Sequence, residues 1–463
     1  MTDRTRRPFT VPERLERLPL SGYQRMIFMI IATAWLFDSM DLGMLTYVLG
    51  SIKTEMHLSA AQAGALGSMS FAGMFAGAGL SGLLADRFGR RSVFQWSMVI
   101  WGIASILCAF AGSLSQLMAW RVLLGFGMGM EFPIGQSLVS EFIPTRHRGR
   151  YIALLEGFWP LGFIAAGVLA YLLLPLGGWR LVFVAEGVPA VFVLVVRRIV
   201  PESPRWLEAR GHKEEAERVM SAFEEKVRNA LGARELPHPL RLPAAASGLA
   251  AVSRFSFLEL WTAGYAQRTA MVWSLWFFAL IGYYGLTTWL GALLQEAGYT
   301  VTKSTLYIVT ISLAGVPGFF TAAYLVEAWG RKPSMVATLA GSAVMAYYYG
   351  TAANTLALVS FGLGMQFFMF GMWSVLYAYT PELYPTHARA TGAGFASSIG
   401  RVGALLGPTI VGLIKPAYGQ SGVFAMGAGA FAIGALIVLA LGVETRGKTL
   451  EELNPVRVRA RSS

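Results

Sequence analysis

Long apolar stretches alternate with short polar stretches along most of the chain. The apolar runs lie at 26–50, 60–84, 92–112, 115–141, 151–175, 178–200, 267–294, 304–327, 333–352, 355–381, 391–415 and 420–443. Each run has roughly the 20 residues that a helix needs to cross the hydrocarbon core of a bilayer at about 1.5 Å per residue. The pattern predicts an all-α integral membrane protein with twelve transmembrane helices.

Acidic residues that flank or follow these runs mark a repeat. They form three pairs along the chain: Asp86 and Glu327, Glu141 and Glu382, and Glu202 and Glu444. The first two pairs are 241 residues apart (327 − 86 and 382 − 141), and the third is 242 residues apart (444 − 202). Motifs that return in the same order at nearly one spacing indicate an internal duplication. The helices are therefore expected to form two related six-helix bundles.

The duplication divides the chain into two bundles and three polar segments. We expect an N-terminal arm at 1–25, a first bundle at 26–200, a linker at 201–266, a second bundle at 267–443 and a C-terminal tail at 444–463. Four apolar residues of the linker follow helical spacing within a charged run: Val219, Met220, Phe223 and Val227. This spacing predicts a short amphipathic helix on the cytoplasmic face, which tethers the two bundles.

The composition agrees with a bilayer protein. Hydrophobic residues make up 55% and charged residues 14% of the 463 positions. The net charge of +12 is compatible with nucleic-acid binding, but the basic residues gather in alternate connections between the apolar runs. This distribution is the positive-inside pattern of membrane proteins. We therefore expect a multi-pass protein of the cell inner (plasma) membrane, with both termini in the cytoplasm and no nucleic-acid partner.

The sequence GLLADRFGRR, from Gly82 to Arg91, resembles the loop signature between the second and third helices of the major facilitator superfamily. The resemblance covers essentially the whole chain and implies a transporter that works by alternating access. PESPRWL from Pro201 and ETRGKTLEE from Glu444 resemble the sugar-porter and organic-ion branches. WLFDSMD from Trp35 more closely resembles bacterial niacin (nicotinate) transporters and aromatic-acid:proton symporters. The Gln-rich seventh helix that is typical of sugar porters is missing.

Ionisable residues in the first and fourth runs are candidates for proton coupling, because each costs at least a few kcal/mol inside a bilayer and needs a partner or a task. Asp38 and Asp41 share a face of the first helix, and Arg121 lies at about the depth of Asp41 in the fourth. The resemblance implies that an acid on the first helix and this arginine act together in coupling. We expect Asp41 to carry the proton, followed as candidates by Asp38 and then Glu131. The alternative is a permanent ion pair that only holds helices together.

Arg401 lies near the middle of the eleventh run, at the depth where transporter substrates bind. No acid in that helix can neutralise it, and a guanidinium offers a planar fork that matches a carboxylate. We therefore predict that Arg401 anchors an organic anion, and the resemblance to organic-anion and aromatic-acid carriers implies the same. The alternative is an ion pair with Glu131, Glu186 or one of the aspartates of the first helix.

Aromatic residues are candidates for the rest of a binding site for a flat ring. They come from three helices: Phe370, Trp373 and Tyr377 on the tenth, Tyr283, Tyr284 and Trp289 on the seventh, and Trp159 on the fifth. An aromatic stripe more often packs helices than binds a ligand. We favour Trp373 and Trp159, because each lies near mid-helix among glycines, and we add Asp38 as a further substrate contact.

Charged residues of the repeated motifs are predicted to gate the transporter rather than to contact substrate. They are Asp86, Arg90, Arg91, Glu141, Arg148, Glu327, Arg331, Glu382 and Arg389. Charge pairs at the ends of sliding helices can hold the outward-facing state and break when the cytoplasmic side opens. The same basic residues also set the orientation of the helices.

The leading hypothesis is that a monomeric transporter takes up a small aromatic carboxylate together with protons, and nicotinate is the leading candidate for this substrate. A sugar or polyol porter is the alternative transport function, favoured by the two cytoplasmic motifs and disfavoured by Arg401. A non-transporting receptor on the same fold would not require Asp38 and Asp41. The sequence contains no nucleotide-binding loop, metal-ligand spacing or Ser/His/Asp set, so we expect neither an enzyme nor a cofactor or metal.

Overall fold

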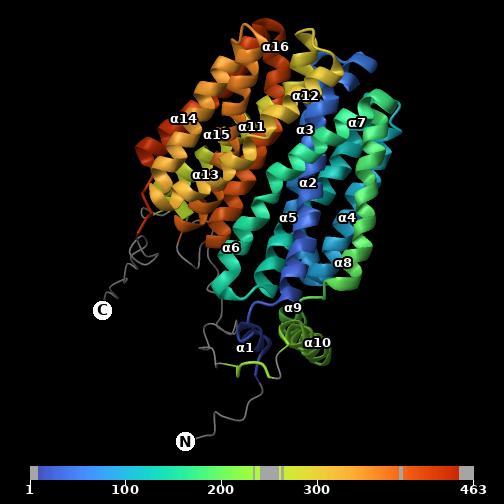
Figure 1. Cartoon of the computed structure of the whole chain (residues 1–463), viewed down its shortest axis with the longest axis vertical. Coiled ribbons are helices and arrows are strands. Elements are labelled where there is room, and N and C mark those ends of the chain that lie inside the picture. Colours follow the sequence, from blue (N-terminus) through green and yellow to red (C-terminus); the bar gives the residue numbers. More distant parts are fainter. Residues whose placement is uncertain (1–8, 233–234, 240–259, 262–264, 385–388, 448–463) are drawn as a thin grey trace, which may run out of the picture.

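The computed structural model describes residues 9–232, 235–239, 260–261, 265–384 and 389–447, and most of these residues are helical (Figure 1). The first bundle consists of α2 (Gly22–Glu55), α3 (Ala60–Phe88), α4 (Arg90–Ala109), α5 (Leu114–Phe142), α6 (Thr145–Glu156), α7 (Phe158–Gly187), η1 (Val188–Phe192) and α8 (Val193–Ile199). The second consists of α11 (Ala266–Glu296), α12 (Val301–Ser312), α13 (Gly315–Ala328), α14 (Arg331–Gly350), α15 (Thr355–Glu382) and α16 (Arg389–Leu441). The predicted arm residues 1–8 and tail residues 448–463 lie outside the described part.

Glycines divide the two longest apolar helical spans, Arg146–Ile199 and Thr391–Leu441, into separate membrane crossings. α7 breaks at Gly177 and Gly178, and α16 breaks at Gly419. Gly178 and Gly419 have φ values of 63° and 62°, a conformation that glycine adopts without the steric cost of a Cβ atom. Nine helices of the described residues are long and apolar enough to cross a membrane, and two of these nine contain such a break. With α14, which has 20 residues, the predicted twelve crossings in two bundles are confirmed.

The repeated motifs form the same structure at the start of α4 and of α14. Gly89 and Gly330 precede these helices with φ values of 94° and 112°. The Glu202 carboxylate accepts hydrogen bonds from the first two backbone N–H groups of α4 (2.9 and 3.1 Å), and the Glu444 carboxylate does the same for α14 (3.0 and 3.1 Å). The first N–H groups of a helix have no partner inside the helix and favour a negative charge. In each bundle, the acid of the third repeated pair (Glu202 or Glu444) therefore caps the helix that follows the acid of the first pair (Asp86 or Glu327).

The two bundles contact each other at the end of the molecule where α2 and α11 end, which we call the far end. There Glu296 of α11 pairs with Lys53 of the first bundle and with Lys415 of α16. The Ser68 hydroxyl of α3 lies 2.7 Å from the Thr409 hydroxyl of α16. At the opposite end, which we call the base, no hydrogen bond or ion pair between described residues joins the first bundle to the second. The bundles are therefore closed at the far end.

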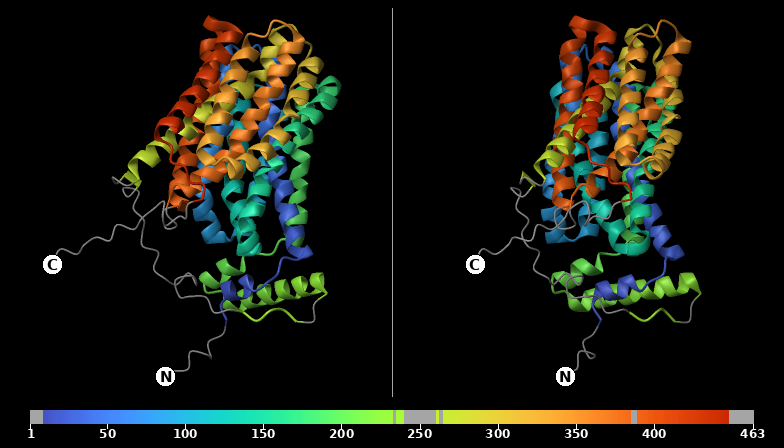
Figure 2. Two further views of the ribbon diagram at one scale, coloured as in Figure 1. Left: turned by 60° about the vertical axis from the view of Figure 1, so that its left-hand side comes forward. Right: turned by 90° about the vertical axis from the view of Figure 1, so that its left-hand side faces the viewer.

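Helix α10 (Lys213–Leu231) lies across the base of the first bundle, next to α1 (Val11–Glu16) and α9 (Pro204–Ala209) (Figure 2). Its apolar side buries Met220, Phe223 and Val227. The Phe223 ring stacks on the Phe142 ring of α5, with the centroids 5.4 Å apart. Its charged side receives Arg14 of α1, which pairs with two glutamates of α10 at 2.5 and 2.7 Å.

Candidate functional site

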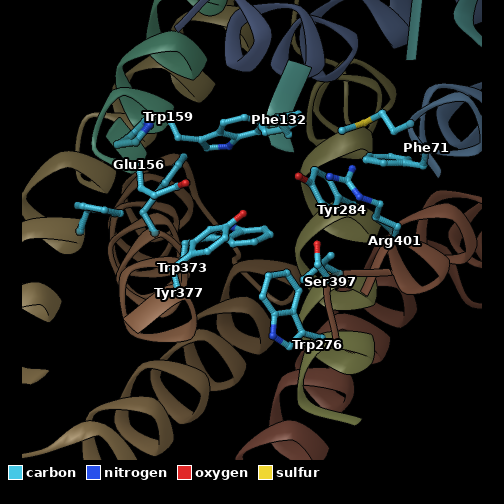
Figure 3. A pocket seen from close by; sticks show the side chains of 16 residues that line it. Phe71, Phe132, Glu156, Trp159, Trp276, Tyr284, Trp373, Tyr377, Ser397 and Arg401 are labelled. Atoms are coloured by element: carbon cyan, nitrogen blue, oxygen red, sulfur yellow. The ribbon is translucent and has the colours of Figure 1, made fainter. Parts of the chain in front are cut away.

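A cavity lies between the two bundles and encloses about 600 Å³ of empty space, its opening to solvent included (Figure 3). Its lining residues come from α3, α5, α6 and α7 of the first bundle and from α11, α13, α15 and α16 of the second. Most of these residues are aromatic or aliphatic. The charged residues among them are Arg401 of α16 and Glu156 of α6. A site of this kind suits a flat, mainly apolar molecule with one or two polar groups.

Arg401 points into this cavity from α16 (Figure 3). Its guanidinium carbon lies 5.5 Å from the centre of the Phe132 ring, within the range of a cation–π contact. In the part of the chain that the structure describes, Arg401 forms no ion pair and no hydrogen bond with another side chain. None of the alternative partners considered above, which are Glu131, Glu186 and the aspartates of the first helix, pairs with Arg401 in this structure. The N–H donors of Arg401 are therefore available to a ligand.

The aromatic wall opposite Arg401 is built mainly from α15. The rings of Trp373 and Tyr377 stack with centroids 5.7 Å apart and an interplanar angle of 23°. Trp276 of α11 packs edge-on against both, at 6.2 and 5.6 Å. From the first bundle, the Trp159 and Phe132 rings lie 5.4 Å apart. These rings give the cavity apolar faces on both bundles.

The ionisable residues of the first bundle form a separate buried cluster. The Arg121 Nη1 atom lies 4.0 Å from the Asp41 Oδ2 atom, at the limit of an ion pair, and both side chains are buried. Glu186 is close enough to interact electrostatically with both. Glu131 accepts hydrogen bonds from a serine hydroxyl and a tryptophan N–H of α4, at 3.2 and 3.1 Å. Both carboxyl oxygens of Asp38 are buried, and neither has a hydrogen-bond partner among the described residues.

Comparison with known proteins places this architecture in a family. The family model described as "Sugar (and other) transporter" matches residues 28–456. The chain belongs to this transporter family. It is therefore a multi-pass membrane transporter of the major facilitator superfamily and not an enzyme, as the sequence predicts.

Two relatives and one solved structure define the neighbourhood of this transporter. The niacin transporter NiaP of Acinetobacter baylyi is 37% identical over 441 residues, which cover 95% of this chain and 98% of that protein. The putative niacin/nicotinamide transporter NiaP of Bacillus subtilis is 34% identical over 429 residues, which cover 92% of this chain and 98% of that protein. The partially occluded inward-open xylose transporter XylE from E. coli has a TM-score of 0.74 at 19% identity, with 93% of this chain and 100% of that chain covered, and it shares the fold.

Some expected substrate contacts of the transporter lie outside the cavity wall. Tyr284 lines the cavity, but its neighbour Tyr283 does not and instead packs against Trp373 at 5.4 Å. Asp38 lies in the buried cluster of the first bundle and is absent from the wall. The Trp289 N–H donates to the Pro408 carbonyl at 3.0 Å, near the far end. For these three residues, the structure gives no support to direct contact with substrate.

Several residues of the cavity wall were not predicted from the sequence, namely Phe71, Phe132, Glu156, Trp276 and Ser397. The spacing of Trp276 could have predicted its place in the wall, because it lies eight residues before Tyr284, about two helical turns away and on the same face. Glu156 could also have been predicted, because it is an acid within an apolar run. The side chain is only 5% exposed, and its Oε1 atom accepts a hydrogen bond from the Gln136 amide at 3.0 Å.

The predicted gating residues of the first bundle lie at the base, away from the cavity. Arg90 pairs with Glu141, and both belong to the same bundle. The Arg91 guanidinium donates to a backbone carbonyl of α8. The backbone carbonyl of Asp86 accepts hydrogen bonds from the Trp206 side chain of α9 and from the Arg210 side chain just after α9, both at 2.8 Å. Arg148 pairs with the glutamate that ends α1, at 3.4 Å.

The gating residues of the second bundle repeat the main pair. Arg331 pairs with Glu382 at 2.9 Å and with Glu327 at 3.0 Å. Arg389 begins α16, but its side chain lies outside the described part of the structure. The pairs of Arg90 and Arg331 connect helices of one bundle in a state that is closed at the far end. Their role in switching between states stays a prediction.

Proposed function

We propose that this transporter imports nicotinate together with protons by alternating access. The observation that carries the proposal is Arg401, a cation without an acidic partner among the described residues, which points into an aromatic cavity between the two bundles. The names of the two NiaP relatives agree with a pyridine carboxylate as substrate.

Nicotinate fits the chemistry of the wall. Its carboxylate can accept two parallel hydrogen bonds from the Arg401 guanidinium, the strongest form of this contact. Its ring can lie against Trp373 and Tyr377 on one side and against Trp159 on the other, where aromatic rings pack edge-on or offset. A neutral sugar would instead leave the Arg401 charge unneutralised and would cover its own hydroxyls with apolar rings, which costs free energy for each unpaired polar group. The cavity therefore favours an aromatic anion over a sugar.

The buried cluster supplies the proton-coupling site in this proposal. A carboxylate inside the membrane must either pair with a cation or hold a proton, because an isolated charge is too costly there. Asp41 is at the limit of ion-pair distance from Arg121, so a small helix movement makes or breaks the pair. Asp41 is the proposed proton carrier, Asp38 is the second candidate, and Glu131 is the third because hydrogen bonds already hold it.

The orientation follows from the positive-inside pattern of the sequence. This pattern places the base and both termini in the cytoplasm, the closed far end outside the cell and the protein in the cell inner (plasma) membrane. In this orientation the described state is closed to the outside. A monomer suffices, because both halves of the cavity come from one chain.

Uptake into proteoliposomes tests the proposal. Purified protein is reconstituted, an inward proton gradient is imposed, and accumulation of labelled nicotinate, nicotinamide, benzoate and a hexose is measured. We expect nicotinate to accumulate only with the gradient, nicotinamide to be taken up poorly, and the hexose not to be taken up. Gradient-driven accumulation of the hexose without nicotinate would establish the sugar-porter alternative, and no transport of any compound by folded protein would favour the receptor.

A further inference from the structure

Glu156 is the acidic residue of the cavity wall, and Figure 3 shows it on the side of the cavity opposite Arg401. It ends α6 immediately before Gly157 and is almost fully buried. Among the described residues it forms no ion pair with a cation, Arg401 included. The cavity therefore presents a cation at one side and a carboxyl group at the other.

The carboxyl group is held in place rather than free to turn away. The Gln136 amide of α5 donates to its Oε1 atom at 3.0 Å. No side chain of the described part donates to or accepts from its Oε2 atom. One oxygen of Glu156 is thus fixed by the protein, and the other is available to a molecule in the cavity.

We propose that Glu156 binds the ring nitrogen of a pyridine carboxylate and so distinguishes this substrate from benzoate. The inference rests on the proposed function, in which Arg401 holds the substrate carboxylate. In nicotinate the ring nitrogen is meta to the carboxylate and lies on the ring edge away from it. When the carboxylate contacts Arg401, the nitrogen is directed across the cavity toward the Glu156 side.

One proton between Glu156 and the ring nitrogen completes the contact. Either the pyridinium N–H donates to the carboxylate, or the carboxylic acid O–H donates to the neutral nitrogen, and the atoms are the same in both cases. With this proton, the charges of Arg401, Glu156 and nicotinate sum to zero. A benzoate ring offers only a C–H edge at that position, so Glu156 loses contact with water without gaining a hydrogen bond.

A binding comparison of three acids tests this inference. Affinities of nicotinate, benzoate and picolinate are measured on purified full-length protein by competition with labelled nicotinate. Picolinate is the matched control ligand, because its nitrogen is next to the carboxylate and faces the Arg401 side. We expect the native protein to bind nicotinate more tightly than benzoate or picolinate, by about tenfold or more, since the free energy of a hydrogen bond with a charged group corresponds to such a ratio of affinities.

In Glu156→Met the ratio of nicotinate affinity to benzoate affinity should fall to near one, because nicotinate binding weakens while benzoate binding stays constant or tightens. Glu156→Gln keeps the acceptor for Gln136 and provides a second variant if the methionine variant does not fold. Its neutral amide makes a weaker bond to the nitrogen, so we expect the preference to fall several-fold. Equal losses for all three acids in a folded variant, or an unchanged preference, would overturn the inference.

The Arg401→Ala variant separates this inference from the proposed function. It should weaken nicotinate and benzoate in parallel, because both carry the carboxylate. If the native protein binds none of the acids, the proposed function itself is wrong. If binding depends on Arg401 but the preference does not depend on Glu156, only the present inference is wrong.

Discussion

Replacing Arg401 with alanine removes the proposed anchor of the substrate carboxylate. The guanidinium is part of the cavity wall, lies 5.5 Å from the Phe132 ring and is not neutralised by an acid of the described residues. A hydrogen-bonded contact between two charged groups contributes about 1.5 to 3 kcal/mol. At about 1.4 kcal/mol per factor of ten, Arg401→Ala should weaken nicotinate binding roughly 10- to 150-fold.

Two further measurements make this prediction specific. Arg401→Lys should recover only part of the affinity, because an ammonium group cannot reproduce the planar fork of the guanidinium. Nicotinamide, which has the same ring without the charge, should bind weakly to the native protein and lose little more in the variant. Binding is measured by isothermal titration calorimetry on purified protein, with the folded state checked by its thermal unfolding.

Arg180→Ala is the matched control. Arg180 is 42% exposed and pairs with Glu55 within the first bundle near the far end, so the variant loses the same side chain far from the cavity. Its nicotinate affinity should equal that of the native protein. If nicotinate and nicotinamide are equally affected by Arg401→Ala, or if neither is affected, Arg401 is structural and the case for an anionic substrate fails.

Other parts of the molecule give four further predictions. Asp41→Asn should abolish accumulation driven by a proton gradient but leave some exchange of substrate, which requires no net proton release; accumulation against a gradient by this variant would place coupling elsewhere. Asp86→Asn should lower turnover with little change in affinity, because the residue lies at the base, and a large loss of binding would contradict its gating role. Glu296→Gln removes both ion pairs of Glu296, including the Lys53 pair that joins the two bundles, so distances between spin labels on the two bundles should lengthen at the far end; unchanged distances would show that this end closes without the Lys53 pair. The Arg14 guanidinium lowers the pKa of the Glu217 carboxyl by donating a hydrogen bond to it, so this contact stabilises α1 on α10 above the ordinary glutamate pKa of about 4.3 and is lost as the pH falls from there through the lowered pKa. Protection of α1 against hydrogen exchange, corrected for the pH dependence of intrinsic exchange, should then fall; unchanged protection on acidification or in Arg14→Ala would contradict this.

The number of crossings was predictable because it depends on hydrophobic length alone. The apolar runs ended at 175 and 415 and resumed at 178 and 420, and the structure breaks its helices at Gly178 and Gly419. The rule that an apolar stretch must match the bilayer thickness acts on each run separately, without information about its neighbours. The sequence therefore separates the two crossings that lie on either side of each glycine break.

The cavity wall was predictable only in part, because it depends on how each helix is rotated about its axis. Tyr283 and Tyr284 are adjacent in the sequence and point about 100° apart on a helix. Only Tyr284 reaches the cavity. Rotation and tilt are set by packing against neighbouring helices, which no single run contains. Trp373 and Tyr377 were predicted together because their spacing of four residues keeps them on one face for any rotation.

The far end shows how the duplicated bundles can close on one another with few charges. A Cβ atom added at Gly64 of α3 would lie 2.6 Å from the Pro408 carbonyl oxygen of α16, and one added at Gly412 would lie 2.5 Å from the Ala60 carbonyl oxygen. The backbones of α3 and α16 therefore meet directly, as small residues allow for helices in a membrane. Contact of this kind is lost completely when the helices separate by the width of one side chain. The closed state at the far end is thus a discrete arrangement rather than one position in a continuous range, as alternating access requires.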